Sequence, residues 1–398
     1  MLMKRNPTNQ FKIRNTFLPF HQPLIENEEI DEVVSTLKSG WLSTGPKVHQ
    51  FEKSMSEYLD APHCIALNSG TAALHLALKA IGLKENDEVI IPTNTFTATG
   101  EVITYFNAKP VLVDSAIENF NIDENKIEAK ITKKTKAIMP VHFAGNPCEM
   151  GIIQNICKKY DLKLIEDAAH ALTSKFQNDL IGTIGDITCF SFYATKNITT
   201  GEGGMAVTAN PLYAEKIRKL SLHGINVDAW NRYGKKGSWF YEVSDAGYKY
   251  NMSDILASIG IIQMKKVELM LKKRTDIANT YTNELSNIPS ITLPRPNIEN
   301  RHAWHLYVIQ IKQDQLNINR EQFIHKLKEY NIGSSVHFIP LHRHPYYQNK
   351  FRYSPKDFPN SESIYNSSIS LPIYPKMTET DVNYVIEAVK NIASTNKK

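Results

Sequence analysis

The chain has 398 residues, of which 42% are hydrophobic and 22% are charged, a composition that excludes wholesale disorder, collagen-like repeats and a coiled coil. Lysine and arginine number 46 against 41 aspartates and glutamates, so the formal net charge is only +5. This balance does not indicate a nucleic acid as partner, although it would suit a substrate that carries phosphate.

Cysteine usage and hydropathy predict where the protein acts. The four cysteines have no Cys-x-x-Cys spacing, which indicates reduced thiols and no metal site. Residues 1–16 lack the apolar core of a signal peptide, and no run of about 18 apolar residues occurs in the chain. We therefore expect a cytoplasmic protein that does not associate with a membrane.

Short β-branched runs alternate with helical or loop stretches between residues 64 and 208. Such alternation is typical of a mostly parallel sheet covered by helices, and thus of an α/β domain. Apolar periodicity predicts helices at Thr71–Ile81 and Glu149–Tyr160. The seven predicted strands are Cys64–Leu67, Glu88–Ile91, Pro110–Val113, Ala137–Val141, Lys163–Glu166, Ile187–Phe192 and Met205–Thr208.

The C-terminal third has a different pattern. Helical periodicity runs through Ser253–Leu285, and we place a domain boundary inside it. We expect a large domain at residues 1–265 and a smaller α+β domain at residues 266–398. The smaller domain would contain an apolar run at Trp304–Ile311 and helices at Arg320–Tyr330 and Glu379–Ile392.

In open α/β sheets, ligands bind beyond the carboxyl ends of the strands, so the residues after each strand are the informative ones. The first such segment is Asn68–Thr71, where a strand turns into a helix. Small residues there would let the backbone approach a ligand, and the free N–H groups would attract a phosphate. An ordinary helix N-cap is an equally good interpretation of this motif alone.

The second segment, Leu164–His170, is an apolar strand that runs into two acids, two small residues and a histidine. A carboxylate at the tip of a buried strand is costly unless it is paired. Asp167 could hold a cationic ring nitrogen, with Glu166 turned to the other face of the sheet. A solvated turn or a helix cap is the alternative.

The third segment, Ser191–Gly204, delivers a hydroxyl, then Lys196, then a glycine-rich stretch. A lysine in a partly desolvated site has a lowered pKa and can attack carbonyl groups to form a Schiff base. A single lysine is usually a surface charge. A phosphate cradle, a ring-nitrogen carboxylate and a lysine in this order, however, match what pyridoxal phosphate requires of a protein.

The chain also resembles the DegT/DnrJ/StrS family of sugar aminotransferases, which have the fold of type I pyridoxal phosphate enzymes. This resemblance implies a large domain with a mostly parallel seven-stranded sheet and a smaller C-terminal α+β domain. The motifs that carry it extend over nearly the whole chain: Gly40–Pro46, Asn68–Leu74, Pro92–Thr99, Glu166–Ala171, Ser191–Gly204, Gly247–Asp254 and Ser335–Pro340.

The resemblance implies a role for each matching residue. Lys196 would form the Schiff base and move the proton, while Asp167 would pair with the ring nitrogen. The remaining implied contacts are Gly70, Thr71 and Ser191 with the phosphate, Phe96 with the ring face, His170 near the phenolic oxygen, Asn251 with the partner subunit's cofactor phosphate, and His337 and Tyr193 with the substrate.

Two positions depart from the family pattern. Members often have His where this chain has Tyr193, and many read Asn-Tyr-Arg where this chain has Lys249–Asn251. The first departure bears on a substrate contact, and the second on the contact between subunits.

The activity implied by the resemblance is transfer of an amino group from L-glutamate to a nucleotide-linked keto sugar. We expect a UDP-4-keto-6-deoxyhexose as acceptor, surface polysaccharide or glycan biosynthesis as the pathway, and a homodimer with shared active sites. The alternatives are a cofactor-bearing regulator without catalysis and an aminotransferase for 3-keto sugars. A nicotinamide enzyme is disfavoured because no GxGxxG motif opens the first βα unit.

Two further segments have no definite assignment. His337, His342 and His344 could suggest a metal, but no carboxylate or thiolate is spaced to complete the ligand set, so we expect none. The aromatic segment Trp230–Tyr241 could cover a sugar nucleotide or fill a subunit interface.

Overall fold

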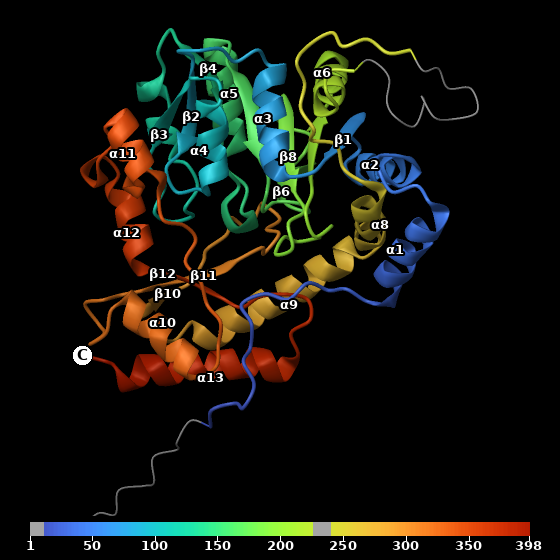
Figure 1. The fold of residues 1–398 in the computed structure, drawn as a ribbon. Helices are drawn as coiled ribbons and strands as arrows, with labels where there is room; N and C mark the ends of the chain where they lie inside the picture. The colour runs from blue at the N-terminus through green and yellow to red at the C-terminus, as the bar shows by residue number, and fades with distance from the viewer. Residues whose placement is uncertain (1–11, 226–239) are drawn as a thin grey trace, which may run out of the picture.

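The computed structural model describes residues 12–225 and 240–398. Figure 1 shows a large sheet with its helices in the upper part of the molecule, and helices α9, α10 and α13 around a small sheet below it. This arrangement confirms the predicted α/β fold.

The large sheet has seven strands in the order β1-β9-β8-β5-β4-β2-β3. Only β9 runs antiparallel to its neighbours, and the other six strands share one direction. All seven correspond to predicted strands: β1 (His63–Leu67), β2 (Glu88–Pro92), β3 (Lys109–Val113), β4 (Thr135–Ile138), β5 (Lys163–Asp167), β8 (Ile187–Ser191) and β9 (Gly204–Thr208).

Strand β4 ends three residues earlier than the predicted run Ala137–Val141. Beyond Ile138 the chain leaves the ladder, and Val141 makes only an isolated bridge to Asp167. Apolar content alone could not reveal this end, because residues 139 and 141 remain buried beside the sheet.

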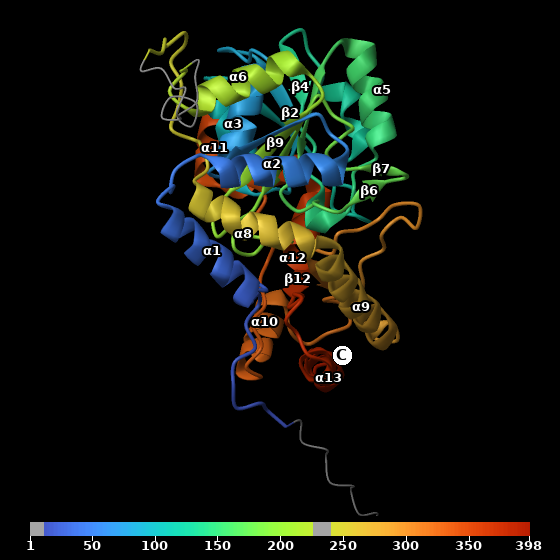
Figure 2. The ribbon, with the colours of Figure 1, turned by 90° about the vertical axis from the view of Figure 1, so that its right-hand side faces the viewer.

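Helices cover both faces of this sheet, since each face of a buried sheet must be shielded from water. One face packs against α3 (Gly70–Ala80), α4 (Thr97–Thr104) and α6 (Pro211–Ser221). The other packs against α2 (Pro46–Leu59), α5 (Met150–Tyr160) and α8 (Asp254–Lys265). Helix α1 (Asn27–Ser39) lies beside α8, as Figure 2 shows.

The lower part has its own apolar core around a three-stranded antiparallel sheet. Helix α8 ends at Lys265 and α9 begins at Val267, so the predicted boundary falls at a break between two helices. The elements of this core are α9 (Val267–Leu285), β10 (Ile291–Thr292), β11 (Tyr307–Ile311), α10 (Arg320–Glu329), β12 (Ser368–Leu371) and α13 (Glu379–Thr395).

Two segments cross between the upper and lower parts. Leu18, near the N-terminus, is hydrogen-bonded to the backbone of Asn331 and Gly333 and packs in the lower core. Conversely, Leu341 and Tyr347 pack in the upper core. The division at residue 265 therefore stays a prediction, because each part contains chain from the other side of the boundary.

The remaining elements are short. The connecting elements are the hairpin β6 (Lys175–Phe176) and β7 (Asp179–Leu180), helices α11 (Pro345–Phe351) and α12 (Pro359–Ser367), and the 3₁₀ turns η1 (Glu124–Lys126), η2 (Glu128–Lys130), η3 (Phe143–Gly145), η4 (Leu341–Arg343) and η5 (Pro355–Asp357). The four cysteines are buried and unpaired. Among the described residues, no helix has the length and apolar content needed to cross a membrane.

Candidate active site

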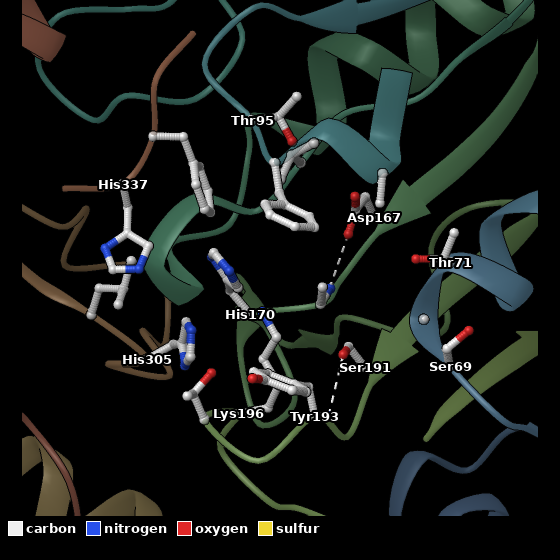
Figure 3. A pocket seen from close by; sticks show the side chains of 18 of the residues that line it. Ser69, Thr71, Thr95, Asp167, His170, Ser191, Tyr193, Lys196, His305 and His337 are labelled. Carbon is white, nitrogen blue, oxygen red and sulfur yellow. Dashed lines mark hydrogen bonds between the residues drawn. The ribbon is translucent and has the colours of Figure 1, made fainter. Parts of the chain in front are cut away.

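A cavity of about 480 Å³ lies where the carboxyl ends of β5 and β8 meet the N-terminus of α3. Figure 3 shows Ser69, Thr71 and Ser191 on one side of it and three histidines on the other. Every predicted site residue except Asn251 lines this cavity: Gly70, Thr71, Phe96, Asp167, His170, Ser191, Tyr193, Lys196 and His337.

The N-terminus of α3 forms one wall. Ser69 caps the helix, because its Oγ accepts the N–H of Ala72 at 3.1 Å. Gly70 must lack a side chain there, since a Cβ would come within 2.9 Å of the Ser191 Cβ. No acidic residue occupies the first turn, so the helix dipole and free N–H groups face the cavity uncompensated. This wall is suited to bind an anion such as a phosphate.

Asp167 ends strand β5 and is 5% exposed. Its Oδ2 accepts the hydroxyl of Thr99 at 2.7 Å, and its Oδ1 accepts the N–H of Ala169 at 3.2 Å. Burial raises the pKa of this carboxyl, whereas these two hydrogen bonds and the Lys196 ammonium oppose the rise. Within the described ranges Asp167 has no cation in ion-pair contact, so its carboxylate can hold a positively charged nitrogen in the cavity.

Glu166 points to the opposite face of β5, as strand alternation predicts. Its oxygens accept hydrogen bonds from the N–H of Gly185 at 2.8 Å and the hydroxyl of Thr188 at 2.7 Å, and His142 Nε2 lies 3.0 Å away. His142 Nδ1 accepts the N–H of Cys148, so the neutral imidazole carries its proton on Nε2 and donates it to Glu166. Glu166, His142 and Thr188 are fully buried, and this network anchors the strand end that presents Asp167.

Lys196 lies in the loop between β8 and β9. Because these strands are antiparallel neighbours, the loop returns at the same sheet edge where β5 ends. The hydroxyl of Thr199 donates to the carbonyl of Phe192 and accepts the N–H of Gly201, which fixes the loop. Burial lowers the pKa of Lys196 to about 8, against the influence of Asp167. Its Nζ has no hydrogen-bond partner in the described part of the chain, so this amine is available to react with a carbonyl group.

Two of the predicted histidines are anchored through Nδ1. His170 Nδ1 accepts the N–H of Ala144 at 3.2 Å, and His337 Nδ1 lies 2.8 Å from the Ser370 Oγ. Burial and the charge of Lys196 lower both pKa values, that of His337 to about 4. Both imidazoles are therefore neutral near pH 7.

The remaining predicted residues have different surroundings. Phe96 and Tyr193 line the cavity but are 58% and 47% exposed. Asn251 does not line it in the single chain. Its Nδ2 donates to the Thr44 Oγ1 at 2.7 Å, and its Oδ1 is buried without a partner in the described residues.

The structure adds residues that sequence reasoning missed. Thr99 lies in the motif Pro92–Thr99, four residues after Thr95. This spacing near the start of a helix is the signal in the sequence that points to Thr99. Phe20 and His21 come from the N-terminal segment, and His305 precedes β11. These three residues carried no usable signal, because only the folded chain brings such distant segments to one cavity.

The other histidines of the 337–347 stretch lie elsewhere. His342 is buried, with Nε2 2.7 Å from Glu362 and Nδ1 2.7 Å from Thr93, and His344 contacts the carbonyl of Ile339. No group of three potential metal-binding side chains occurs among the residues that the structure covers. Most of the aromatic segment, residues 226–239, lies outside the described residues.

The residues present fit pyridoxal phosphate. A backbone cradle for an anion, a buried carboxylate without a cation and an unpaired, desolvated amine lie on three sides of one cavity. These groups are what the phosphate, the ring nitrogen and the aldehyde of this cofactor require.

Comparison with known proteins agrees with this fit. The model of the DegT/DnrJ/EryC1/StrS aminotransferase family matches residues 23–390. An uncharacterized protein of Methanocaldococcus jannaschii is 55% identical over 385 residues, which cover 97% of this chain and all of that protein. The spore coat polysaccharide biosynthesis protein SpsC of Bacillus subtilis is 50% identical over 380 residues, covering 95% and 98% of the two chains.

Solved structures agree as well. A Streptococcus pneumoniae protein described as a sugar aminotransferase has been solved in a PMP form, which superposes with a TM-score of 0.89 at 35% identity, covering 95% of this chain and 99% of that one. The same protein has also been solved in its PLP form. The present chain therefore belongs to the DegT/DnrJ/EryC1/StrS aminotransferase family and is an aminotransferase whose cofactor is pyridoxal phosphate.

Proposed function

We propose that this enzyme transfers an amino group from L-glutamate to a nucleotide-linked keto sugar, a UDP-4-keto-6-deoxyhexose, to give an amino sugar for a surface polysaccharide or glycan. The observation that carries the proposal is that Lys196 and Asp167 face one cavity beside a phosphate cradle. The 50% identity to a spore coat polysaccharide biosynthesis protein supports the sugar acceptor and the pathway.

Pyridoxal phosphate, when bound, supplies an aldehyde that condenses with amines and a ring that accepts the electron pair left when a neighbouring carbon loses its proton. The protein has to position the reacting groups and move that proton. Lys196 is suited to both tasks, since a pKa of about 8 leaves part of its amine unprotonated near neutral pH. In our proposal Lys196 Nζ takes the α-proton of the amino donor and returns a proton to the acceptor carbon.

Asp167 would keep the ring nitrogen protonated. The hydroxyl of Thr99 and the N–H of Ala169 hold its two oxygens in fixed directions, so the carboxylate does not have to reorganise as charge develops. A protonated ring nitrogen beside Asp167 would also supply the counter-charge that this buried carboxylate otherwise lacks.

The acceptor sugar would bind on the open side of the cavity. His337 lines it with a neutral imidazole, and the half-exposed ring of Tyr193 stands at its mouth. We propose that these two residues contact the sugar, with Phe96 stacked on the cofactor ring.

We also propose a homodimer in which Asn251 reaches the phosphate site of the partner subunit. Asn251 does not line the cavity of its own chain, and its Nδ2 donates one N–H to the Thr44 hydroxyl, which leaves the second N–H to donate to a phosphate oxygen. Helix α1 presents Ile30, Val34 and Leu37 on one exposed face, and a second copy would cover such an apolar surface. The unpaired cysteines suit the reducing cytoplasm in which we propose that the enzyme acts.

The proposal is tested with purified protein. The protein should be yellow, and borohydride should fix the cofactor to Lys196, as identified by peptide mass. L-Glutamate should then convert the bound cofactor to its amine form, and a panel of 4-keto and 3-keto nucleotide sugars, followed by mass, should identify the acceptor.

Three results would change the assignment. A cofactor that no amino donor converts would indicate the regulatory alternative, and amination of 3-keto sugars alone would indicate the other acceptor class. A mass consistent with a monomer throughout the active concentration range would contradict the shared site.

A further inference from the structure

His305 is a pocket residue that neither the sequence motifs nor the proposed roles account for. It precedes β11 and is 6% exposed, yet it lines the active-site cavity. Its ring lies against that of His170, with the centroids 4.2 Å apart and the planes inclined by 38°. Figure 3 shows both imidazoles beside Lys196.

One residue, Ala144, contacts both histidines through its backbone. The N–H of Ala144 donates to His170 Nδ1 at 3.2 Å, and the carbonyl of Ala144 accepts the backbone N–H of His305 at 2.9 Å. Ala144 adopts a left-handed conformation, with φ of 58°, which is unfavourable for a residue other than glycine. The fold therefore accepts local strain at the residue that holds the His170 ring and the backbone of His305.

The ring nitrogens are arranged alike. With Nδ1 accepting from Ala144, neutral His170 carries its proton on Nε2. His305 Nδ1 is buried and has no hydrogen-bond partner in the described part of the chain, which leaves Nε2 as the nitrogen on the cavity side. An unpaired buried acceptor is less costly than an unpaired N–H, so His305 also carries its proton on Nε2. Two neutral N–H donors thus lie side by side at the cavity wall.

An amino-acid substrate carries an α-carboxylate that needs hydrogen-bond donors of this kind. When its amine is at Lys196, its α-carboxylate is one carbon away and so falls within a few ångströms of Lys196 Nζ. No arginine occurs among the described residues that line the cavity, and Lys196 is the lysine among them. The imidazoles of His170 and His305 line the same cavity and offer N–H donors for this carboxylate.

We propose that His305, together with His170, binds the α-carboxylate of the amino donor through Nε2–H. This inference rests on the proposed use of an amino-acid donor and adds the residue that recognises it.

The proposal has a consequence for proton binding. His305 is surrounded by His170, Lys196, Arg274 and His337, and burial and these four groups hold its pKa well below the usual value. A carboxylate placed against the pair would raise the pKa of both rings. Because two cationic rings would repel each other at 4.2 Å, the pair would take up at most one proton when the donor binds.

The test uses the holoenzyme and glutarate, a dicarboxylate without an amine that cannot react. Calorimetric titration near neutral pH in two buffers of different ionisation enthalpy measures affinity and proton uptake together. We expect wild-type protein to take up no more than one proton, and His305→Phe, which keeps the ring but loses both nitrogens, to bind glutarate about tenfold more weakly or worse.

His302→Phe is the matched control. His302 is 8% exposed, stacks on Trp304 with centroids 4.1 Å apart, and does not line the active-site cavity. This variant should bind glutarate as wild type does. Both variants should keep the cofactor and its absorption spectrum.

Equal glutarate affinity in wild type and His305→Phe, or no glutarate binding by wild type, would overturn the inference. So would loss of the cofactor from His305→Phe alone, which would give His305 a structural role. A different result would show that L-glutamate is not the amino donor: L-glutamate would then leave the absorption of the wild-type cofactor unchanged.

Discussion

Gly204, the first residue of β9, lies directly against the backbone of Ser69. A Cβ on Gly204 would come within 2.3 Å of the carbonyl carbon and oxygen of Ser69 and 2.5 Å of the Gly70 nitrogen. This contact presses the start of α3 onto the sheet edge that carries the Lys196 loop. The position of the anion cradle therefore depends on the absence of one methyl group.

We predict that Gly204→Ala displaces the N-terminus of α3 and weakens pyridoxal phosphate binding by about tenfold or more, because backbone atoms cannot move aside as a side chain would. Titration of the apoenzyme with cofactor measures the effect. Gly151→Ala is the control, since the nearest atoms to its Cβ are 3.8 Å away. Equal cofactor affinity in Gly204→Ala and wild type would contradict the prediction.

Asp167→Asn should lower the rate of the glutamate half-reaction by two to three orders of magnitude. Asparagine can still accept the N–H of Ala169 with its Oδ1 and can donate its Nδ2–H to the Thr99 hydroxyl, so the fold should persist, but its neutral amide cannot keep a ring nitrogen protonated. Rapid-mixing absorption spectroscopy follows the half-reaction. Thr99→Val, which removes one of the two donors, should have a smaller effect, and an unimpaired Asp167→Asn enzyme would refute the role assigned to this carboxylate.

Lys196 should make the stability of the apoenzyme depend on pH. Its folded pKa of about 8 lies below the unfolded value of about 10.4, so between these values the unfolded chain holds a proton that the folded chain has lost. The free energy of unfolding should therefore rise with pH across this window and be flat below it. Urea unfolding at a series of pH values measures this, relative to Lys196→Met. Parallel curves for the two proteins would show that Lys196 is not desolvated.

Glu166→Leu should reduce the free energy of unfolding by about 3 to 5 kcal/mol. The change would leave two buried donors, the Thr188 hydroxyl and His142 Nε2, and the partly buried Gly185 N–H without an acceptor. Denaturant unfolding provides the measurement. Glu57→Leu is the control, because Glu57 is exposed and its pairing with Lys53 at 3.7 Å contributes less than about 1 kcal/mol. Similar losses in the two variants would mean that the Glu166 network adds little.

The strands of the large sheet could be predicted because buried parallel strands are continuous apolar runs. Asp167 and Lys196 could be located for a related reason: each follows such a run, and the ends of parallel strands meet at one edge. The direction of β9 could not be predicted in this way, since an apolar run has the same appearance in either direction.

The side of the cavity that His305 forms could not be predicted. His305 is a lone histidine within an apolar run, which is also how an ordinary core histidine appears. Its position depends on the Ala144 turn and on the buried Arg274, whose guanidinium donates to the carbonyls of Trp304, His305 and Ile373. These contacts join residues from 30 to 161 positions apart, beyond the reach of local periodicity.

The N-terminal segment has a practical consequence. Leu18 is hydrogen-bonded between Asn331 and Gly333, the ring of Phe20 stacks on His337, and His21 Nε2–H donates to the carbonyl of Ala194 at 2.9 Å. Truncating the protein so that it begins at α1 would thus remove one wall of the active-site cavity. Expression designs should shorten the protein only upstream of Leu18.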